Sequence, residues 1–223
     1  MGLKGRAFNA MWSNLLESSA RELDRWHTIE HMPERLGVPG FLRGRRYINA
    51  VASDHSIFIL YEAAHIETFR SPGLIARLND PTEWSKRVQP GLLNFTRGPC
   101  QTLISLGEGV GGAILTVRLS GDARYGAQVG NEITDLAPAL TRLHGVTAVH
   151  IGRHVPDEID TAEKKLRPPT APPTFGFVIL VEGIGTAELE AAKPDVVKIA
   201  AGSASSALEL GVFRLAYLLD HVA

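Results

Sequence analysis

The residues best suited to chemistry lie in one short stretch, from Trp26 to Tyr47. It reads WHTIEHMPERLGVPGFLRGRRY and holds two of the eight histidines and four of the seventeen arginines. His27 and His31 are four residues apart, so a helix places both side chains on one face. Because imidazole titrates near neutral pH, His31 is the leading candidate for a general acid or base, with Glu30 or Glu34 as the group that orients it or raises its pKa.

An arginine-rich strand is expected directly after this helix. Arg43, Arg45 and Tyr47 alternate, so in a strand their side chains share one face. Guanidinium groups bind carboxylates through two hydrogen bonds, and a phenol can donate a further one. The pattern predicts an anion pocket in which Arg43, Arg45 and the preceding Arg35 bind the substrate and Tyr47 assists catalysis. A solvated sheet face explains the same alternation.

The expected helix, from residue 20 to about residue 31, carries polar groups where a structural helix would carry apolar ones. At about 100° per residue, one stripe starts with apolar side chains and continues into His27, with Glu30 and His31 on its flanks. Pro33 should end the helix soon afterwards. A bend at Pro33 that exposes these groups to solvent is the alternative. The apolar members of the stripe are Leu16, Ala20 and Leu23.

Two further roles follow for this helix. Trp26 and His27 are candidate substrate contacts, although Trp26 fits better as a core anchor. The His27 and His31 pair also suits a metal ion, but no third ligand stands out and HEXXH spacing is absent. Cys100 is the only cysteine, which excludes a disulfide framework and a thiolate cage. We therefore expect neither a metal nor another cofactor.

Composition excludes several classes of partner. The net charge of −1 provides no basic field for nucleic acid or for an anionic membrane. No apolar run approaches the ~18 residues of a membrane span, and the N-terminus lacks the apolar core of a signal peptide. A cytoplasmic protein with a small anionic substrate is expected, with no nucleic acid or membrane partner. A homodimer is left open.

The order of predicted elements repeats once along the chain. The first half reads β-α-β-β-α-β, the order of a ferredoxin-like unit, and the glycine-rich segment 107–112 separates it from a second copy. The fold class is therefore α+β, with two tandem ferredoxin-like units at 1–107 and 108–223. The expected strands are 6–14, 41–50, 56–63, a part of 92–106, 113–119, 146–155, 175–183 and 208–219, and the second copy has helices at 123–143 and 186–202.

The second copy lacks the chemical residues of the first. At an offset of 107, His27 aligns with Thr134 and His31 with Pro138. We therefore expect 1–107 to carry the active site and 108–223 to be mainly scaffold. The cluster should lie in a cleft between the first helix and its sheet, and the matching region of the second half should be filled or shallow. Residues 156–173, rich in proline and charge, fit a flap or a disordered loop.

The stretch TIEHMPERLGVPGFLRGRRY resembles the helix-to-strand segment of the dimeric α/β-barrel superfamily, in particular its EthD-like branch. The resemblance implies ferredoxin-like units whose sheets pair face to face into a barrel, here within one chain. It also implies a site histidine on the first helix, which corresponds to His31. The superfamily includes muconolactone isomerases, polyketide cyclases, cofactor-free monooxygenases, haem-binding chlorite dismutases and dye peroxidases, so the fold does not fix the function.

Three hypotheses for the function follow. The first is a cofactor-free isomerase or lyase that transfers a proton on a small unsaturated carboxylic acid, and the resemblance suggests a ring-cleavage product of aromatic catabolism. His31 would move the proton, Arg43 or Arg45 would hold the carboxylate, and Tyr47 would donate a hydrogen bond. The second is a haem or metal protein with His31 or His27 as ligand. The third is a non-catalytic small-molecule binding protein.

Overall fold

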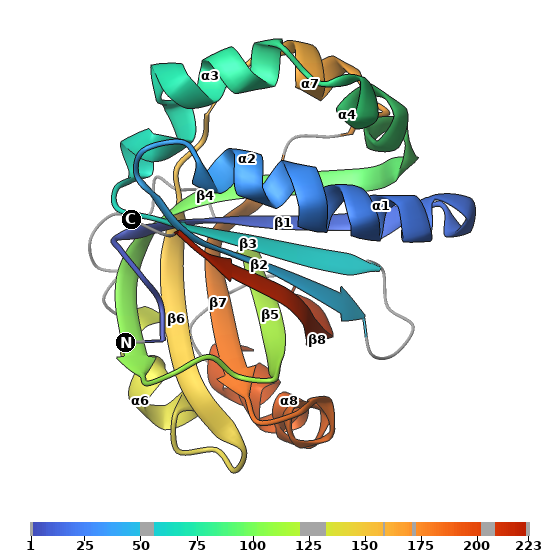
Figure 1. Ribbon diagram of the computed structural model, residues 1–223. Coiled ribbons are helices and arrows are strands. Elements are labelled where there is room, and N and C mark those ends of the chain that lie inside the picture. The colour runs from blue at the N-terminus through green and yellow to red at the C-terminus, as the bar shows by residue number, and fades with distance from the viewer. Residues whose placement is uncertain are drawn as a thin grey trace.

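A computed structural model describes residues 2–49, 56–120, 133–157, 159–170, 173–201 and 208–221 (Figure 1). Within these ranges the strands form one closed antiparallel barrel in the order β1-β3-β2-β8-β5-β7-β6-β4. The strands are β1 (Ala7–Leu15), β2 (Phe41–Asn49), β3 (Ile57–Ala63), β4 (Leu92–Gly107), β5 (Ala113–Ser120), β6 (Val146–His154), β7 (Phe175–Gly183) and β8 (Leu208–Asp220).

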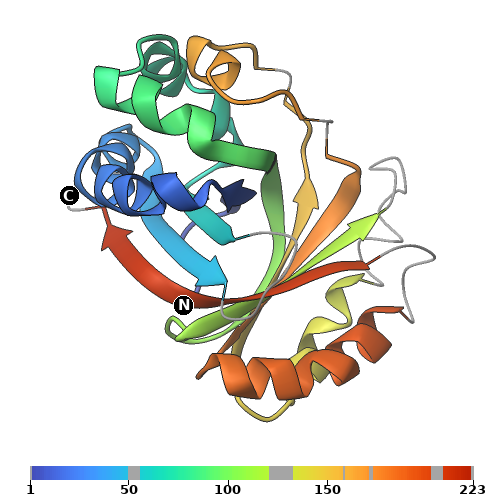
Figure 2. The same cartoon turned by 90° about the vertical axis from the view of Figure 1, so that its right-hand side faces the viewer.

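Helices cover the barrel in two groups on opposite sides (Figure 2). The first half supplies α1 (Ala20–Trp26), α2 (Met32–Leu36), α3 (Pro72–Asn79) and α4 (Glu83–Val88). The second half supplies α6 (Ala137–Leu140) and α8 (Thr186–Ala201) on the other side, and α7 (Ala162–Lys165), which lies with the helices of the first half. Of the helix predicted at 123–143, residues 123–132 lie outside the described residues, and α6 is much shorter than the described remainder of that prediction.

The two halves repeat one strand order. The first half is ordered β4-β1-β3-β2 and the second β8-β5-β7-β6, which is the expected ferredoxin-like arrangement twice. The halves join through antiparallel pairs of β2 with β8 and of β4 with β6. The units therefore hydrogen-bond edge to edge, in addition to facing each other across the barrel, and this pairing protects the edge strands of both sheets.

Strand alternation separates an inner core from two outer cores. Phe8, Ala10 and Trp12 of β1 pack in a cluster that also contains Ile114 and Phe213 of the second half, so these side chains fill the barrel. The residues between them face the opposite way, as the period of two requires. The outer faces pack under the helices of their own half, in one cluster under α1–α4 and another under α6 and α8.

The first helix does not end near residue 31. A π-helical turn from His27 to His31 connects α1 to α2, and the Met32 backbone N–H donates to the carbonyl of His27. Pro33 lacks an N–H and its ring would clash with a carbonyl one α-helical turn earlier, so a wider turn directly before it lets the helix continue. Leu16 and Ala20 are exposed, which corrects their expected place against the sheet.

The β6–β7 connection, residues 155–174, reaches across the molecule. It leaves the second unit at the end of β6 and runs to the helices of the first unit, where α7 contacts α3 (Figure 1). The chain then returns to β7. Its described residues thus form a cover over the first unit, the flap rather than the disordered loop of the two alternatives. None of the helices in the described ranges combines the length and apolar character that a membrane span needs.

Candidate functional site

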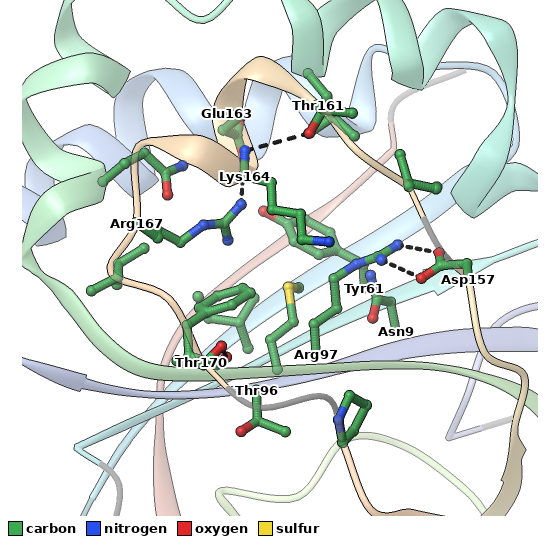
Figure 3. A pocket seen from close by; sticks show the side chains of 18 of the residues that line it. Asn9, Tyr61, Thr96, Arg97, Asp157, Thr161, Glu163, Lys164, Arg167 and Thr170 are labelled. Carbon is green, nitrogen blue, oxygen red and sulfur yellow. Dashed lines mark hydrogen bonds and ion pairs between the residues drawn. The ribbon is translucent and has the colours of Figure 1, made fainter.

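A cavity of about 1210 Å³ lies between the outer face of the first sheet and its helices (Figure 3). The sheet contributes residues of β1, β3 and β4 and the first residue of β2, and the helical layer contributes α1, the π-helical turn, α2 and α3. The β6–β7 connection supplies a further wall that includes Asp157, Glu163 and Arg167. The second half, which the sequence predicted to be mainly scaffold, therefore contributes side chains to the cavity of the first half.

Two buried histidines form one wall of this cavity. The rings of His27 and His31 lie 5.6 Å apart, and both come from the π-helical turn. His31 stacks on the Trp26 indole, with 4.2 Å between ring centroids and 29° between planes. The Trp26 Nε1–H donates to Ser85 Oγ at 3.2 Å, which fixes the indole. Trp26 thus acts as the expected core anchor and also holds the plane of the His31 ring.

The surroundings keep both imidazoles neutral. Burial, followed by the nearby charges of Arg46 and Arg35, places the pKa of His27 well below its usual value. For His31 the pKa is also well below its usual value, through burial and then through Arg35, His27 and Arg167. The Tyr61 hydroxyl lies 3.4 Å from His27 Nε2, and burial raises the pKa of that phenol. At neutral pH the pair can accept a proton, and Tyr61 can donate a hydrogen bond.

Unpartnered polar atoms concentrate at this cavity. Among the described residues, seven buried side-chain nitrogen or oxygen atoms have no hydrogen-bond partner, and five of them belong to residues that line it. Buried polar atoms without a partner destabilise a fold by about 1–3 kcal/mol each, so their clustering indicates a site that a polar ligand completes. These atoms are Asn9 Oδ1, His27 Nδ1, His31 Nδ1, Arg35 Nη1 and Gln89 Oε1.

One carboxylate in the cavity wall faces two guanidinium groups. Glu163 of α7 forms a hydrogen-bonded ion pair with Nη2 of Arg35, and its other oxygen lies 3.4 Å from Nη2 of Arg167. Nη1 of Arg35 is 3.4 Å from Glu34 Oε2 without making a hydrogen bond. Burial, partly offset by Glu163, and the charges of Arg97 and Arg35 lower the pKa of Arg167 to about 10. Within the cavity wall, Glu163 is therefore shared by two guanidinium groups.

A second ion pair fastens the start of the connection. Both Nη atoms of Arg97, on β4, donate to the carboxylate of Asp157, at 2.6 and 2.8 Å. Figure 3 shows this two-pronged pair at one side of the cavity, with Lys164 extending between it and Arg167. Such paired geometry is specific as well as strong, so it holds the connection in place over the cavity.

Arg43, Arg45 and Tyr47 lie on the other side of the sheet. They share one face of β2, as the alternation predicts, but that face is the barrel interior. Arg45 is fully buried and donates to Glu62 at 2.6 Å, to Glu182 at 2.7 Å and to the Tyr47 hydroxyl at 3.0 Å. The expectation of one pocket that unites them with His31 is therefore wrong.

The same interior network continues into the second half. Glu182 Oε1 also lies 2.9 Å from His150 Nε2, and His150 Nδ1 lies 2.8 Å from Ser105 Oγ. Burial would raise the pKa of Glu182, but the hydrogen bonds and charges of His150 and Arg45 outweigh it and lower that pKa. The Ser–His–Glu line resembles a catalytic triad in its distances. The carboxylate oxygen is already shared with Arg45, which indicates a structural ion network.

The helix side of β2 has different residues. Arg46 donates to Thr28 Oγ1 at 3.1 Å and pairs with Asp24, which anchors the strand to the first helix. Glu30, the predicted partner of His31, accepts a hydrogen bond from Thr82 Oγ1 at 2.5 Å and does not line the cavity. Of the predicted site residues, the structure thus brings together Trp26, His27, His31 and Arg35.

Sequence reasoning missed several residues of the cavity. Tyr61 lies on a strand of mainly apolar residues, and Gln89 stands alone in its segment, so no pattern marks them. Glu163 and Arg167 lie in the charged, proline-rich connection, whose unusual length was the available signal. Within the described ranges, no group of three or more His, Cys, Asp or Glu side chains is arranged to hold a metal ion.

Comparisons with known proteins agree on the architecture. No protein-family model matches the chain, and no curated protein matches it in sequence. Several solved structures superpose over nearly its whole length. An anthrone oxidase-like protein matches with a TM-score of 0.63 at 9% identity, covering 98% of this chain and 94% of that one. The chain has the dimeric α/β-barrel fold.

Two other neighbours of this fold support the same conclusion. A candidate monooxygenase from Fusobacterium nucleatum gives a TM-score of 0.57 at 10% identity, with 98% and 96% of the two chains covered. A candidate chlorite dismutase gives 0.55 at 12% identity, with 96% of each chain covered. At such identities the likeness concerns the fold alone, and the EthD-like branch stays a prediction.

Proposed function

We propose that the cavity is the active site of a cofactor-free isomerase or lyase, in which His31 transfers a proton at a carbon activated by a carbonyl group. The observation that carries this proposal is the pair of buried, neutral imidazoles whose Nδ1 atoms have no partner in the described structure. A neutral imidazole accepts a proton directly. Trp26 holds the His31 ring in a fixed plane, and His27 with Tyr61 forms a second polar group beside it.

The negative charge that develops on the substrate would meet donors in the cavity. Nη1 of Arg35 makes no hydrogen bond, although Glu34 Oε2 lies 3.4 Å away, and the Tyr61 phenol keeps its proton because burial raises its pKa. Donors fixed before the reaction stabilise an enolate more than mobile water does. In this proposal Arg35 replaces Arg43 and Arg45 as the electrostatic partner, because Arg45 pairs with Glu62 and Glu182 inside the barrel and Arg43 pairs with Asp220.

The low pKa of His31 also restricts the substrate. A weak base removes only a comparatively acidic proton, so the reacting carbon needs activation by a conjugated carbonyl group. The cavity, at about 1210 Å³, exceeds the roughly 300–1,000 Å³ of ordinary ligand pockets. A conjugated molecule of several rings therefore fits this site better than the small acid that the sequence suggested.

Proton exchange in D₂O tests the proposal. Anthrone serves as the multi-ring probe and muconolactone as the small acid probe, and deuterium incorporation is followed by NMR under nitrogen. We expect the wild type to accelerate exchange and His31→Ala to lower the rate by about 10²–10⁴-fold. The control is His144→Ala, which removes an exposed histidine of the second half. Equal rates for His31→Ala and the wild type would contradict the proposal.

A second candidate is oxygenation, which the oxidase-like and monooxygenase-like fold neighbours suggest. It begins with the same proton removal. The resulting carbanion would reduce O₂, so that one oxygen atom enters the product as a carbonyl group and the other leaves as water. Consumption of one O₂ for each anthrone converted to the quinone, lost in His31→Ala, would identify this reaction. Exchange without O₂ consumption would favour the isomerase or lyase.

The remaining alternatives have their own measurements. A haem ligand role for His31 or His27 predicts a shifted absorbance band on addition of haemin, which His31→Ala or His27→Ala removes; an unchanged spectrum contradicts it. A non-catalytic binding protein would show ligand-induced thermal stabilisation with neither exchange nor O₂ consumption.

A further inference from the structure

We propose that the β6–β7 connection of the second half is an anion-recognition element, and that the site takes a multi-ring aromatic molecule bearing one acidic group. This inference rests on the proposed function, because it concerns the substrate of the same cavity. It assigns to the connection a role in binding: Arg167 and Arg35 would hold the acidic group, and Glu163 would occupy their charge when the site is free of ligand.

Basic side chains outnumber acidic ones in the lining of the cavity. Five lining side chains are basic, namely Arg35, Arg97, Lys164, Lys165 and Arg167, and three are acidic, namely Asp157, Asp160 and Glu163. Arg97 pairs with Asp157, and Lys165 lies 3.0 Å from Asp160. Glu163 is the lining carboxylate that remains for Arg35 and Arg167, and Glu34, outside the lining, lies 3.4 Å from Nη1 of Arg35. Even with Glu34 counted, five basic side chains face four acidic ones, so one anion added to the cavity would balance the charge.

Part of this positive charge is buried beside His31. Arg35 is 4% exposed, and its Nη1 has no hydrogen bond. A buried guanidinium with an unused donor needs an acceptor, and a carboxylate or phenolate oxygen fits its geometry. Arg35 and Arg167 both lie close enough to His31 to lower its pKa. An acidic group held there would place the rest of the molecule beside the proposed base.

Aromatic side chains line several parts of the cavity. The Arg167 guanidinium lies 4.1 Å from the centroid of the Phe95 ring, so it presents a flat surface beside the cavity. Trp26, Phe41 and Phe175 line other parts of it. Aromatic walls bind aromatic rings through offset or edge contacts. The large volume, together with these walls, favours several fused rings over a single ring.

Binding of two matched probes tests the inference without any turnover. The probes are anthracene-2-carboxylate and its neutral amide, and their dissociation constants are measured by fluorescence titration. We expect the wild type to bind the carboxylate on the order of tenfold tighter than the amide, since a charge-assisted hydrogen bond is lost in the amide. The preference should be salt-dependent, because the anion is bound by charge.

Variants of the connection sharpen the test. Arg167→Gln should remove the preference for the carboxylate, whereas Glu163→Gln should tighten carboxylate binding several-fold and leave amide binding unchanged. Arg142→Gln, at an exposed position of the second half, is the matched control and should keep the wild-type preference. Lys164→Met changes an exposed side chain of α7, the helix that carries Glu163, and should weaken carboxylate binding less than Arg167→Gln does. Thermal unfolding of each variant checks that the fold is intact.

Several outcomes would overturn the inference. Equal binding of carboxylate and amide by the wild type would exclude an anion site, and weaker carboxylate binding by Glu163→Gln would exclude the role of Glu163. Absence of saturable binding of both probes at millimolar concentration would exclude the aromatic class. His31→Ala should keep the carboxylate preference, so loss of proton transfer and loss of anion recognition are measured separately.

Discussion

The barrel interior and the outer cavity both bury charged groups, but they differ in how far those groups have hydrogen-bond partners. In the interior, Arg45 lies between Glu62 and Glu182, and His150 joins the same network. In the cavity, His27, His31 and Arg35 keep donors or acceptors without partners. Buried polar groups that are fully paired specify a fold, whereas unpaired ones indicate where a ligand binds. The residue types alone do not separate these two cases.

Separating the two halves of the chain should have the largest effect, because the barrel interior belongs to both halves and the fragment would expose it. Residues 1–107 alone would lose the pairing of β2 with β8 and of β4 with β6, and would expose interior side chains such as Phe8, Trp12 and Phe58. Apolar burial contributes about 25 cal/mol per Å², so we expect this fragment to aggregate or self-pair. Light scattering after size-exclusion chromatography measures it. A monomeric fragment with a cooperative unfolding transition would contradict the prediction.

The next largest effect is expected from replacing one buried arginine in each region and comparing the loss of stability. Arg45→Met leaves Glu62 and Glu182 buried without their central partner, so we expect the free energy of unfolding to fall by about 3–5 kcal/mol. Arg35→Met should cost about 1–2 kcal/mol, because Glu163 keeps Arg167 nearby. Denaturant titrations measure both, with the exposed Arg142→Met as control. An Arg35→Met loss as large as that of Arg45→Met would remove the distinction.

The smallest expected effect is a pH dependence of stability from the cavity histidines. The folded state holds the pKa values of His27 and His31 below their ordinary value of 6.5. As pH falls below about 6.5 the unfolded chain binds more protons than the folded one, so the free energy of unfolding decreases. The double substitution of both residues by Gln should flatten this slope between about pH 6.5 and 5.

Two features sharpen that measurement. His154, whose pKa is also lowered by burial, leaves a residual slope in the double variant. The interior contributes in a more acidic window, because the lowered pKa of Glu182 stabilises the fold above its ordinary value of 4.5 and this stability is lost below it. A slope from pH 6.5 to 5 that is unchanged in the double variant would contradict neutral cavity histidines.

The sequence by itself determined the order of elements and the sharing of faces. Hydrophobic alternation and turn residues predicted the strands of both units, since these patterns depend on local geometry. The four-residue spacing of His27 and His31 placed them together. The alternation of Arg43, Arg45 and Tyr47 likewise predicted that they share a face of β2, and they do.

Only the tertiary structure decided which of those faces forms the cavity. A period of two does not say which side of a strand points into the barrel, so Arg45 and Tyr47 could be assigned to either face until the halves joined. The pairing of Arg35 with Glu163 joins residues 128 positions apart, and no local pattern encodes such a contact. It exists because the β6–β7 connection crosses from one unit to the other, which makes the second half a part of the site.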